Sequence, residues 1–351
     1  MARFITDGTI ELDRGVSVYS CAAAVGKMES DGPLGNCFDY AAEGAELGLT
    51  TWEKAESTFQ QYAFDIALRK GKLIKEDISF IFAGDLLNQC TGSAYGLRDT
   101  DIPFIGLYGA CSTMAESLAM ASLFADMRLG EFFAAVTSSH FCSAERQFRF
   151  PINYGGVRPP TAQWTTTAAG RRIRCLHRLR PGPGGVITSA AEKPPFVKSI
   201  TIGKITDMGI KDANNMGAAM AGAAYDTIKR HFLATDTSPA DYDMIYTGDL
   251  GQVGSDLMHE LFRRDGIGIE DKHKDCGLML YDREKQDVHA GGSGCGCSAS
   301  VLCGHILPQI ADGKLHRVLF AATGALMSTT KVQQGESIPG ISHLVEITDT
   351  I

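Results

Sequence analysis

Two segments of the chain, "DISFIFAGDLLNQ" at residues 77–89 and "DYDMIYTGDLGQV" at residues 241–253, follow one pattern. In each, an apolar run leads into Gly-Asp-Leu and then a polar loop, so Asp85 and Asp249 occupy matching positions. A short apolar run bounded by turn residues is typical of a buried strand. The pattern therefore predicts two equivalent strands, each followed by a loop that carries an aspartate.

Further matches indicate that the chain is an internal duplication. The segment "YGACSTMAESL" resembles "SGCGCSASVLC", which pairs Cys111 with Cys297. The segment "FAAVTSS" resembles "FAATGAL", which pairs Thr137 with Thr323 at the same spacing. We therefore expect two α/β halves, residues 1–185 and 186–351, each of ordinary domain size.

Short apolar runs alternate with helical stretches along the whole chain. This alternation, with small residues at the strand ends, is typical of an α/β fold with largely parallel, buried strands. The expected strands include residues 15–26, 78–84, 132–139, 244–249 and 317–325. The expected helices include residues 52–71 and 212–234.

Composition narrows the class of protein. The 351 residues are 44% hydrophobic and carry a net charge of −8, which argues against non-specific nucleic-acid binding. The first residues lack a basic segment followed by an apolar core, so we expect no signal peptide. Ten cysteines without a secretion signal predict a reducing, intracellular location and free thiols.

The segment "LYGACSTMAESLAM" at residues 107–120 places Cys111 between an expected buried strand, residues 102–110, and an expected helix. A thiol at a helix N-terminus feels unpaired backbone N–H groups, which lower its pKa. This position suits a nucleophile and equally suits a group that helps to hold an anion. The alternative interpretation is a buried, inert cysteine.

Several longer strings carry a resemblance to a known family. They are "GPLG" with "FD" (32–39), "WEKAES" (52–57), "AGDLLNQ" (83–89), "YGACSTMAES" (108–117), "TSSHFCSAERQFRFP" (137–151), "GGVRPPTAQWT" (155–165), "GIKDANNMGAAMA" (209–221), "TGDLGQVG" (247–254) and "HAGGSGCGCSA" (289–299). The chain resembles the stage V sporulation protein AD family of spore-forming bacteria. That family belongs to the thiolase-like superfamily, with the thiolases and ketoacyl synthases.

The resemblance implies both a fold and a function. The fold is a thiolase-like α-β-α-β-α sandwich of two duplicated halves, forming a homodimer. The function is to bind dipicolinic acid, supporting its uptake into the developing spore and its release at germination. The implied partners are the membrane proteins of the stage V sporulation A operon. The implied location is soluble or peripheral at the forespore or spore inner membrane.

Thiolase-type catalysis needs a histidine and an asparagine, or two histidines, beside the thiol. The resemblance places these groups in "TGDLGQVG", which has Asp249 but no histidine, and in "HAGGSGCGCSA", where Ser293 stands in the expected region. His140 is the nearest candidate base. We therefore expect a non-catalytic binding protein, with an acyltransferase that uses Cys111 as nucleophile and His140 as base as the alternative.

The expected ligand is a planar dianion that chelates calcium. Backbone donors at Cys111, with the Ser138, Ser139 and His140 side chains, would hydrogen-bond its carboxylates. The predicted ligand-binding residues are Asp85, Cys111, Ser138, Ser139, His140, Asp249 and Ser293.

Calcium would enter only with the ligand, and no other cofactor and no resident metal is expected. Asp85 and Asp249 would then complete the oxygen shell of that calcium. Alternatively, both aspartates cap loops or helices. Arg146 and Arg149 would either pair with a carboxylate or form structural ion pairs on a solvated helix face.

Two other patterns are assigned no function. Cys295, Cys297, Cys303 and His305 are of metal-ligating type, but their spacing favours buried thiols in a helix. Residues 170–183 contain five arginines where the resemblance predicts an interior strand of small, apolar residues. Burying these arginines without charged partners would cost a prohibitive amount of free energy. We therefore interpret the stretch as the product of two compensating reading-frame slips in the gene. The alternative is a basic patch on the protein surface.

Overall fold

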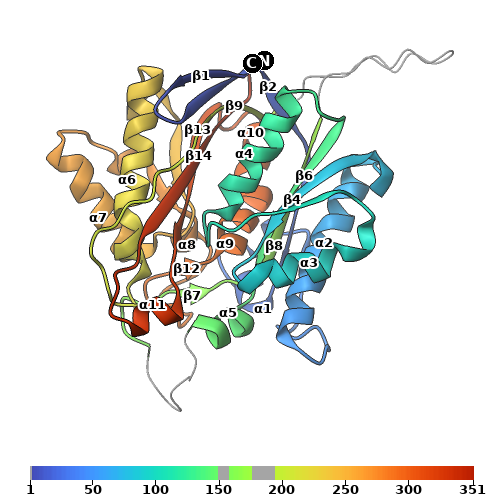
Figure 1. Ribbon diagram of the computed structural model, residues 1–351, viewed down its shortest axis with the longest axis horizontal. Coiled ribbons are helices and arrows are strands. Elements are labelled where there is room, and N and C mark those ends of the chain that lie inside the picture. Colours follow the sequence, from blue (N-terminus) through green and yellow to red (C-terminus); the bar gives the residue numbers. More distant parts are fainter. Residues whose placement is uncertain (1, 149–157, 176–193) are drawn as a thin grey trace.

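The computed structural model describes residues 2–148, 158–175 and 194–351. All strands except β7 and β12, which pair separately, form one mixed sheet in which a five-strand order occurs twice (Figure 1). The first group has the order β5-β4-β6-β8-β2 and the second has the order β11-β10-β13-β14-β9. The groups are joined where β2 runs antiparallel to β9. The duplicated α/β fold predicted from the sequence is therefore confirmed.

The strands of the first group are β2 (Thr9–Val25), β4 (Ile78–Gly84), β5 (Phe104–Gly106), β6 (Phe132–Ser139) and β8 (Ala168–Cys175). Those of the second group are β9 (Phe196–Thr201), β10 (Met244–Thr247), β11 (His273–Asp275), β13 (Arg317–Ala325) and β14 (Gly340–Thr348). Shorter strands are β1 (Arg3–Thr6), β3 (Tyr40–Ala41), β7 (Trp164–Thr165) and β12 (Gly292–Ser293).

The prediction of a largely parallel sheet is wrong. Within each group the first three strands are parallel, and the remaining two run antiparallel to their neighbours. Strands β9 and β14 are antiparallel, yet nearly all of their residues are buried. A continuous apolar run indicates burial on both faces of a sheet and does not report the direction of the strand.

Helices form three layers around the two strand groups. On the outer faces lie α2 (Trp52–Gly71) with α3 (Thr91–Leu97), and α6 (Met216–Thr235) with α7 (Gly251–Arg264). Between the groups lie α4 (Thr113–Asp126) and α9 (Cys295–Val301), which continues through a π-helical segment (Leu302–Ile306) into α10 (Leu307–Ala311). The remaining α-helices of the described residues are α1 (Lys27–Ser30), α5 (Phe141–Phe148), α8 (Cys276–Met279) and α11 (Thr329–Gln333), and several single-turn 3-10 helices lie in the connections.

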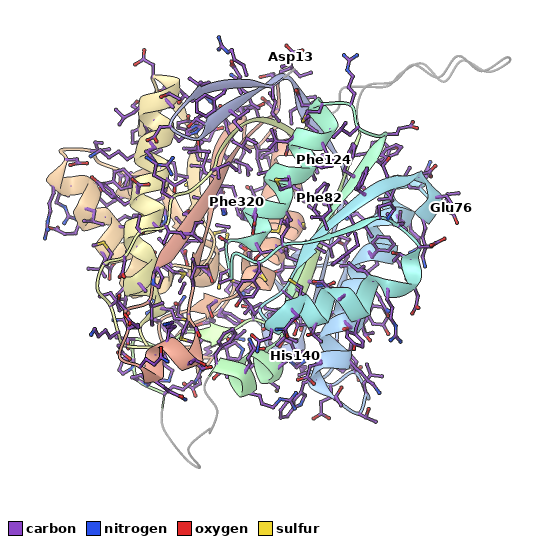
Figure 2. The ribbon with its side chains drawn as sticks, in the orientation of Figure 1. Asp13, Glu76, Phe82, Phe124, His140 and Phe320 are labelled. Carbon is purple, nitrogen blue, oxygen red and sulfur yellow. The ribbon has the colours of Figure 1, made fainter. Side chains whose placement is uncertain are left out.

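Each central helix contacts strands of the opposite half. Helix α4 packs on β13 and β14 as well as on β4 and β6, and α9 packs on β2, β6 and β8. The core continues across the halves: Phe82 and Phe124 stack edge to face at 4.8 Å, and Phe320 belongs to the same buried cluster (Figure 2). The layers therefore interlock through α4 and α9.

Two details of the predicted elements are corrected by the structure. Of the expected buried strand at residues 102–110, only β5 forms, at the edge of the sheet, where Phe104 is 40% exposed. The pairing of Cys111 with Cys297 is also wrong, because Cys111 precedes α4 whereas Cys297 lies inside α9. The central helix of the second half also contains the π-helical segment, which lies after Cys297.

Some expectations fall on parts of the chain outside the described residues. The predicted boundary at residues 185 and 186 does so, and the division into halves there stays a prediction. Arg171, Arg172 and Arg174 lie in β8, which pairs with β2 and β6 inside the sheet, but residues 176–183 are not described. None of the helices in the described ranges has the length and apolar character that crossing a membrane requires.

Candidate functional site

Cys111 lies in a tight turn between β5 and α4. Ser112 Oγ donates to Gly109 O at 2.6 Å, and Thr113 Oγ1 donates to Ala110 O at 2.7 Å. Ala110 has a φ of 51°, in the left-handed region. The turn rests on β13 of the other half, where a Cβ at Gly324 would lie 2.1 Å from Gly109 O. Cys111 thus stands just before a helix, as predicted, and is held there by both halves.

The thiol of Cys111 is not activated. Burial raises the pKa of Cys111 well above its ordinary value, and the neighbouring Asp249 carboxyl raises it further. The expectation of a lowered pKa is therefore wrong. The N-terminus of a helix stabilises a thiolate by at most about 2 kcal/mol. Burial raises a thiol pKa by up to ~5 units, which corresponds to about 7 kcal/mol, so burial is the larger effect.

Asp249 lies beside Cys111 and is fully buried. Its Oδ2 accepts a hydrogen bond from Gly294 N at 2.7 Å, and its Oδ1 has no partner at hydrogen-bonding geometry within the described ranges. Burial raises the pKa of Asp249 to about 8. At neutral pH the carboxyl therefore holds its proton, and the Cys111–Asp249 pair is uncharged.

A narrow cavity opens at Cys111. Its volume is about 30 Å³, room for roughly one water molecule. Ser293 lines it together with Cys111, and so does Glu145, whose carboxyl accepts from Thr165 Oγ1 at 3.4 Å. The sequence analysis missed Glu145; its only signal was a place in the "SAERQF" helix directly after the two small residues Ser143 and Ala144. The remaining lining is mostly apolar and includes Leu86, Ala110, Ala144, Phe148, Met216, Ala325 and Met327.

Asp85 occupies the loop position equivalent to Asp249 but has a different role. Its carboxylate accepts hydrogen bonds from Leu87 N at 2.9 Å and from both Ser93 N and Ser93 Oγ at 2.7 Å. These donors belong to the loop after β4 and to α3. The contacts of Asp85 agree with the capping interpretation.

Ser138 belongs to a buried network that the sequence analysis missed. Its hydroxyl donates to Glu56 Oε1 at 3.0 Å and accepts from Gln60 Nε2 at 2.7 Å, and Ser143 donates to Glu56 Oε2. A Cβ on Gly92 would lie within 3.3 Å of the carboxyl carbons of both Asp85 and Glu56. The signal available in the sequence was Glu56 and Gln60, four residues apart on the apolar face of α2.

Ser139 and His140 do not line the Cys111 cavity. Ser139 Oγ donates to Thr166 O at 2.7 Å and accepts from Gly296 N at 3.2 Å. His140 lies at the α5 end of the molecule, where its Nε2 bonds Ala45 O at 2.8 Å (Figure 2). Burial lowers the pKa of His140, so the imidazole is neutral. The structure brings Asp249 and Ser293 to Cys111 but not the predicted base.

The other candidate ligands have structural partners. Arg146 pairs with Glu53 and stacks over the Trp52 ring at 5.5 Å, in agreement with the structural alternative, and Arg149 lies outside the described residues. Cys295 Sγ donates to Ser138 O at 2.9 Å. Across the described ranges, no three His, Cys, Asp or Glu side chains gather as a metal-binding group.

Solved structures of thiolase-like enzymes resemble this fold. A variant of OleA from Xanthomonas campestris has a TM-score of 0.59 at 11% identity, covering 95% of this chain and 98% of that chain. Human mitochondrial 3-ketoacyl-CoA thiolase has a TM-score of 0.58 at 12% identity, covering 97% and 99%. The 3-oxoacyl-[acyl-carrier-protein] synthase III of Aquifex aeolicus scores 0.57 at 10% identity, covering 95% and 100%. At these identities the likeness establishes the thiolase-like fold alone.

Sequence comparison is more specific. The family model of stage V sporulation protein AD matches residues 6–348. Stage V sporulation protein AD of Bacillus subtilis (strain 168) is 44% identical over 328 residues, 93% of each chain. The chain belongs to the stage V sporulation protein AD family. The resemblance found in the sequence is confirmed, and membership of this sporulation family gives the chain a role in sporulation.

Replacing Glu56 in this family member tests whether the buried carboxyl network carries a proton. Burial and the nearby Asp85 raise the pKa of Glu56, so the native carboxyl stays protonated where the unfolded one ionises. The free energy of unfolding therefore falls as the pH rises above the ordinary value of 4.5, by up to about 1.4 kcal/mol per pH unit. In urea titrations from pH 5 to 8, we expect Glu56→Gln to gain stability relative to wild type as the pH rises.

The matched control is Asp65→Asn, which changes an exposed carboxyl on the same helix. Measured at the same pH values, this variant gives the effect of removing an exposed carboxyl from the helix. A Glu56→Gln stability difference that follows the same pH course would contradict a protonated Glu56.

Proposed function

We propose that this chain binds dipicolinic acid without converting it, and so supports the uptake of the acid into the developing spore and its release at germination. The observation that supports a binding role is the state of Cys111: a buried thiol with a raised pKa beside an uncharged Asp249. Thiolase-type chemistry needs a thiolate and a base that receives its proton. His140, the predicted base, bonds Ala45 instead. The ligand itself is inferred from the family.

One observation favours a second candidate function, an acyltransferase with Cys111 as nucleophile. Glu145 places a carboxyl in the cavity that Cys111 lines, and this carboxyl is a candidate base in place of His140. The thiolase-like fold is compatible with this chemistry.

Calcium would arrive as the chelated ion of the ligand. Three donors already occupy the Asp85 carboxyl and Asp249 is uncharged at neutral pH, so neither is set up to coordinate a cation.

The membrane proteins of the stage V sporulation A operon remain the predicted partners, with a peripheral place at the forespore inner membrane. The homodimer also stays a prediction. The exposed β5 is a strand edge where a second copy would add to the sheet.

Calorimetric titration of dipicolinate, with and without calcium, tests the binding function. We expect a micromolar Kd, about −8 kcal/mol, for the purified chain. In parallel, the protein is incubated with acetyl-CoA and the peptide containing Cys111 is weighed by mass spectrometry. Binding with no acyl adduct supports the proposal, whereas an adduct on Cys111 without dipicolinate binding favours the acyltransferase.

A further inference from the structure

A cysteine of the first half and a histidine of the second half meet near the surface of the molecule. Cys37 ends the single-turn helix Gly35–Cys37, and His305 lies in the π-helical segment. Cys37 Sγ lies 3.9 Å from His305 Nδ1, a distance at which sulfur takes part in a hydrogen bond. Both residues are half-buried, and neither lines the Cys111 cavity. The thiol and the imidazole therefore form a pair that the proposed function does not use.

Gly304 lets the two segments approach each other. A Cβ at Gly304 would lie 2.8 Å from Cys37 O and 2.9 Å from the nearest carbon of the Phe38 ring. The backbone at Cys37 therefore rests directly on the π-helical segment that carries His305. Single π-helical turns inside longer helices are frequent at functional sites.

Gln309 determines which ring nitrogen of His305 carries the proton. Gln309 Nε2 lies 2.7 Å from His305 Nε2, and because an amide nitrogen can only donate, His305 Nε2 accepts. Burial lowers the pKa of His305 and the nearby Lys274 lowers it further, so the imidazole is neutral at neutral pH. A neutral imidazole that accepts at Nε2 has its proton on Nδ1. The Nδ1–H group of His305 therefore faces the Cys37 sulfur.

The surroundings of Cys37 differ from those of the other described cysteines. Six of the nine are buried, and three, Cys21, Cys37 and Cys142, are half-buried. Cys21 Sγ donates to Cys303 O at 3.4 Å, and burial with two neighbouring carboxylates raises the pKa of Cys142. Thiol–disulfide exchange needs an accessible thiolate, and a hydrogen-bond donor at the sulfur favours that charged form. Of the three half-buried thiols, Cys37 is the one that faces such a donor.

We propose that Cys37 is a site of thiol–disulfide exchange, where the protein takes up a low-molecular-weight disulfide as a mixed disulfide. The Cys37 thiolate attacks one sulfur of the incoming disulfide, so a new S–S bond forms and the original S–S bond breaks. The second sulfur leaves as a thiolate and takes up the proton that Cys37 released. Cys37 is oxidised, and half of the incoming disulfide is reduced to a thiol. His305 is a positioning residue, whose Nδ1–H donates to the attacking thiolate.

Incubation of the reduced, full-length chain with hydroxyethyl disulfide at neutral pH tests the site. Peptide mapping by mass spectrometry follows the adduct on each cysteine with time. We expect the peptide containing Cys37 to react at least about tenfold faster than the peptide containing Cys142. Cys142 is the matched control, because it is also half-buried but lies beside carboxylates. The probe is uncharged, so these carboxylates do not repel it.

Two substitutions of His305 separate its hydrogen bond from its contribution to packing. His305→Leu removes the donor and should slow the reaction of Cys37 about fivefold or more, with Cys142 unchanged. His305→Asn places an amide N–H near the position of Nδ1 and should restore most of the rate. Thermal unfolding of both variants checks that they fold, as we expect for a half-buried position.

Equal rates at Cys37 and Cys142 in the wild-type protein would overturn the exchange site, and this comparison holds even if a variant fails to fold. An unchanged Cys37 rate in folded His305→Leu would overturn the role of the imidazole. So would a His305→Asn variant as slow as His305→Leu, because lost packing would then explain both.

Discussion

Gly324→Ala lowers the free energy of unfolding by at least about 3 kcal/mol. A Cβ at this position of β13 would lie 2.1 Å from Gly109 O and 3.1 Å from Cys111 N. Both neighbours are backbone atoms of the turn that carries Cys111, so no side-chain rotation relieves the clash. Overpacking a close-packed interior costs about 1–3 kcal/mol even when side chains can adjust. We therefore expect the turn to be displaced and the contact between the halves to loosen.

Urea denaturation of wild type and Gly324→Ala measures this loss. The control is Gly268→Ala, because a Cβ at Gly268 has no atom within 4 Å and its backbone needs no left-handed conformation. Its stability should stay within about 0.5 kcal/mol of wild type. A Gly324→Ala protein as stable as this control would show that β13 does not support the Cys111 turn as described.

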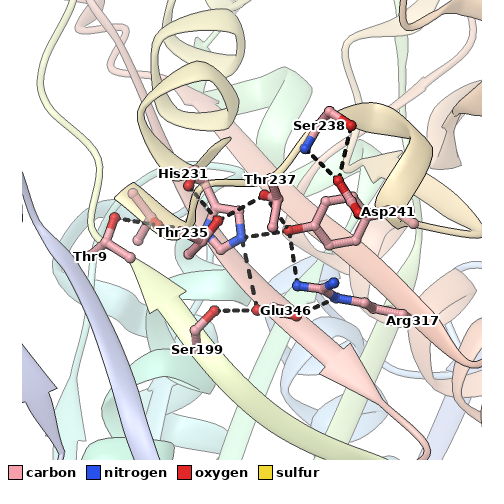
Figure 3. Close-up of polar contacts among 11 residues, drawn as sticks. Thr9, Ser199, His231, Thr235, Thr237, Ser238, Asp241, Arg317 and Glu346 are labelled. Atoms are coloured by element: carbon pink, nitrogen blue, oxygen red, sulfur yellow. Dashed lines mark hydrogen bonds and ion pairs between the residues drawn. The ribbon is translucent and has the colours of Figure 1, made fainter. Parts of the chain in front are cut away.

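Arg317→Met costs about 3–5 kcal/mol of stability, because it leaves a buried carboxylate without its cation. Glu346 in β14 is 2% exposed, and Arg317 Nε donates to its Oε1 at 2.7 Å (Figure 3). Ser199 Oγ donates to the other carboxylate oxygen at 2.6 Å, and the Arg317 guanidinium stacks over the Tyr242 ring at 4.5 Å. The variant keeps an apolar stem of similar length, so the lost charge dominates the effect.

Chemical denaturation again provides the measurement. Arg263→Met is the matched control, since Arg263 pairs with Glu260 and Glu270 on the surface with 62% of its side chain exposed. Exposed pairs contribute at most about 1 kcal/mol. The double variant Arg317→Met/Glu346→Leu removes both charges and should recover most of the loss. If it were as unstable as the single variant, lost packing rather than the unpaired charge would be responsible.

Much of the fold could be predicted because local patterns determine its elements. The apolar runs at 78–84, 132–139 and 317–325 and the helix at 52–71 have the predicted bounds. The duplication was visible because both copies keep the Gly-Asp-Leu turn. The direction of the strands and the exposure of β5 could not be predicted, because both depend on which strands pair in the sheet. The local pattern of apolar residues does not determine that pairing.

The candidate site was less predictable because its properties come from distant partners. The position of Cys111 before a helix is local and was found. Its raised pKa depends on burial and on Asp249, which only the contact between the halves brings close. The two matching aspartates also differ: Asp85 meets three donors of its own loop and helix, whereas Asp249 meets Gly294 and Cys111.

The crossed packing of the central helices has a consequence for synthesis of the chain. Helix α4 needs β13 and β14 to cover it, and both strands leave the ribosome last. At about 5–20 residues per second, a ribosome takes roughly 8–33 s to add residues 186–351. Throughout that time the nascent first half exposes the apolar face of α4. The nascent chain is therefore prone to aggregate during this time. A chaperone that binds the first half until the second is complete would raise the yield of folded protein.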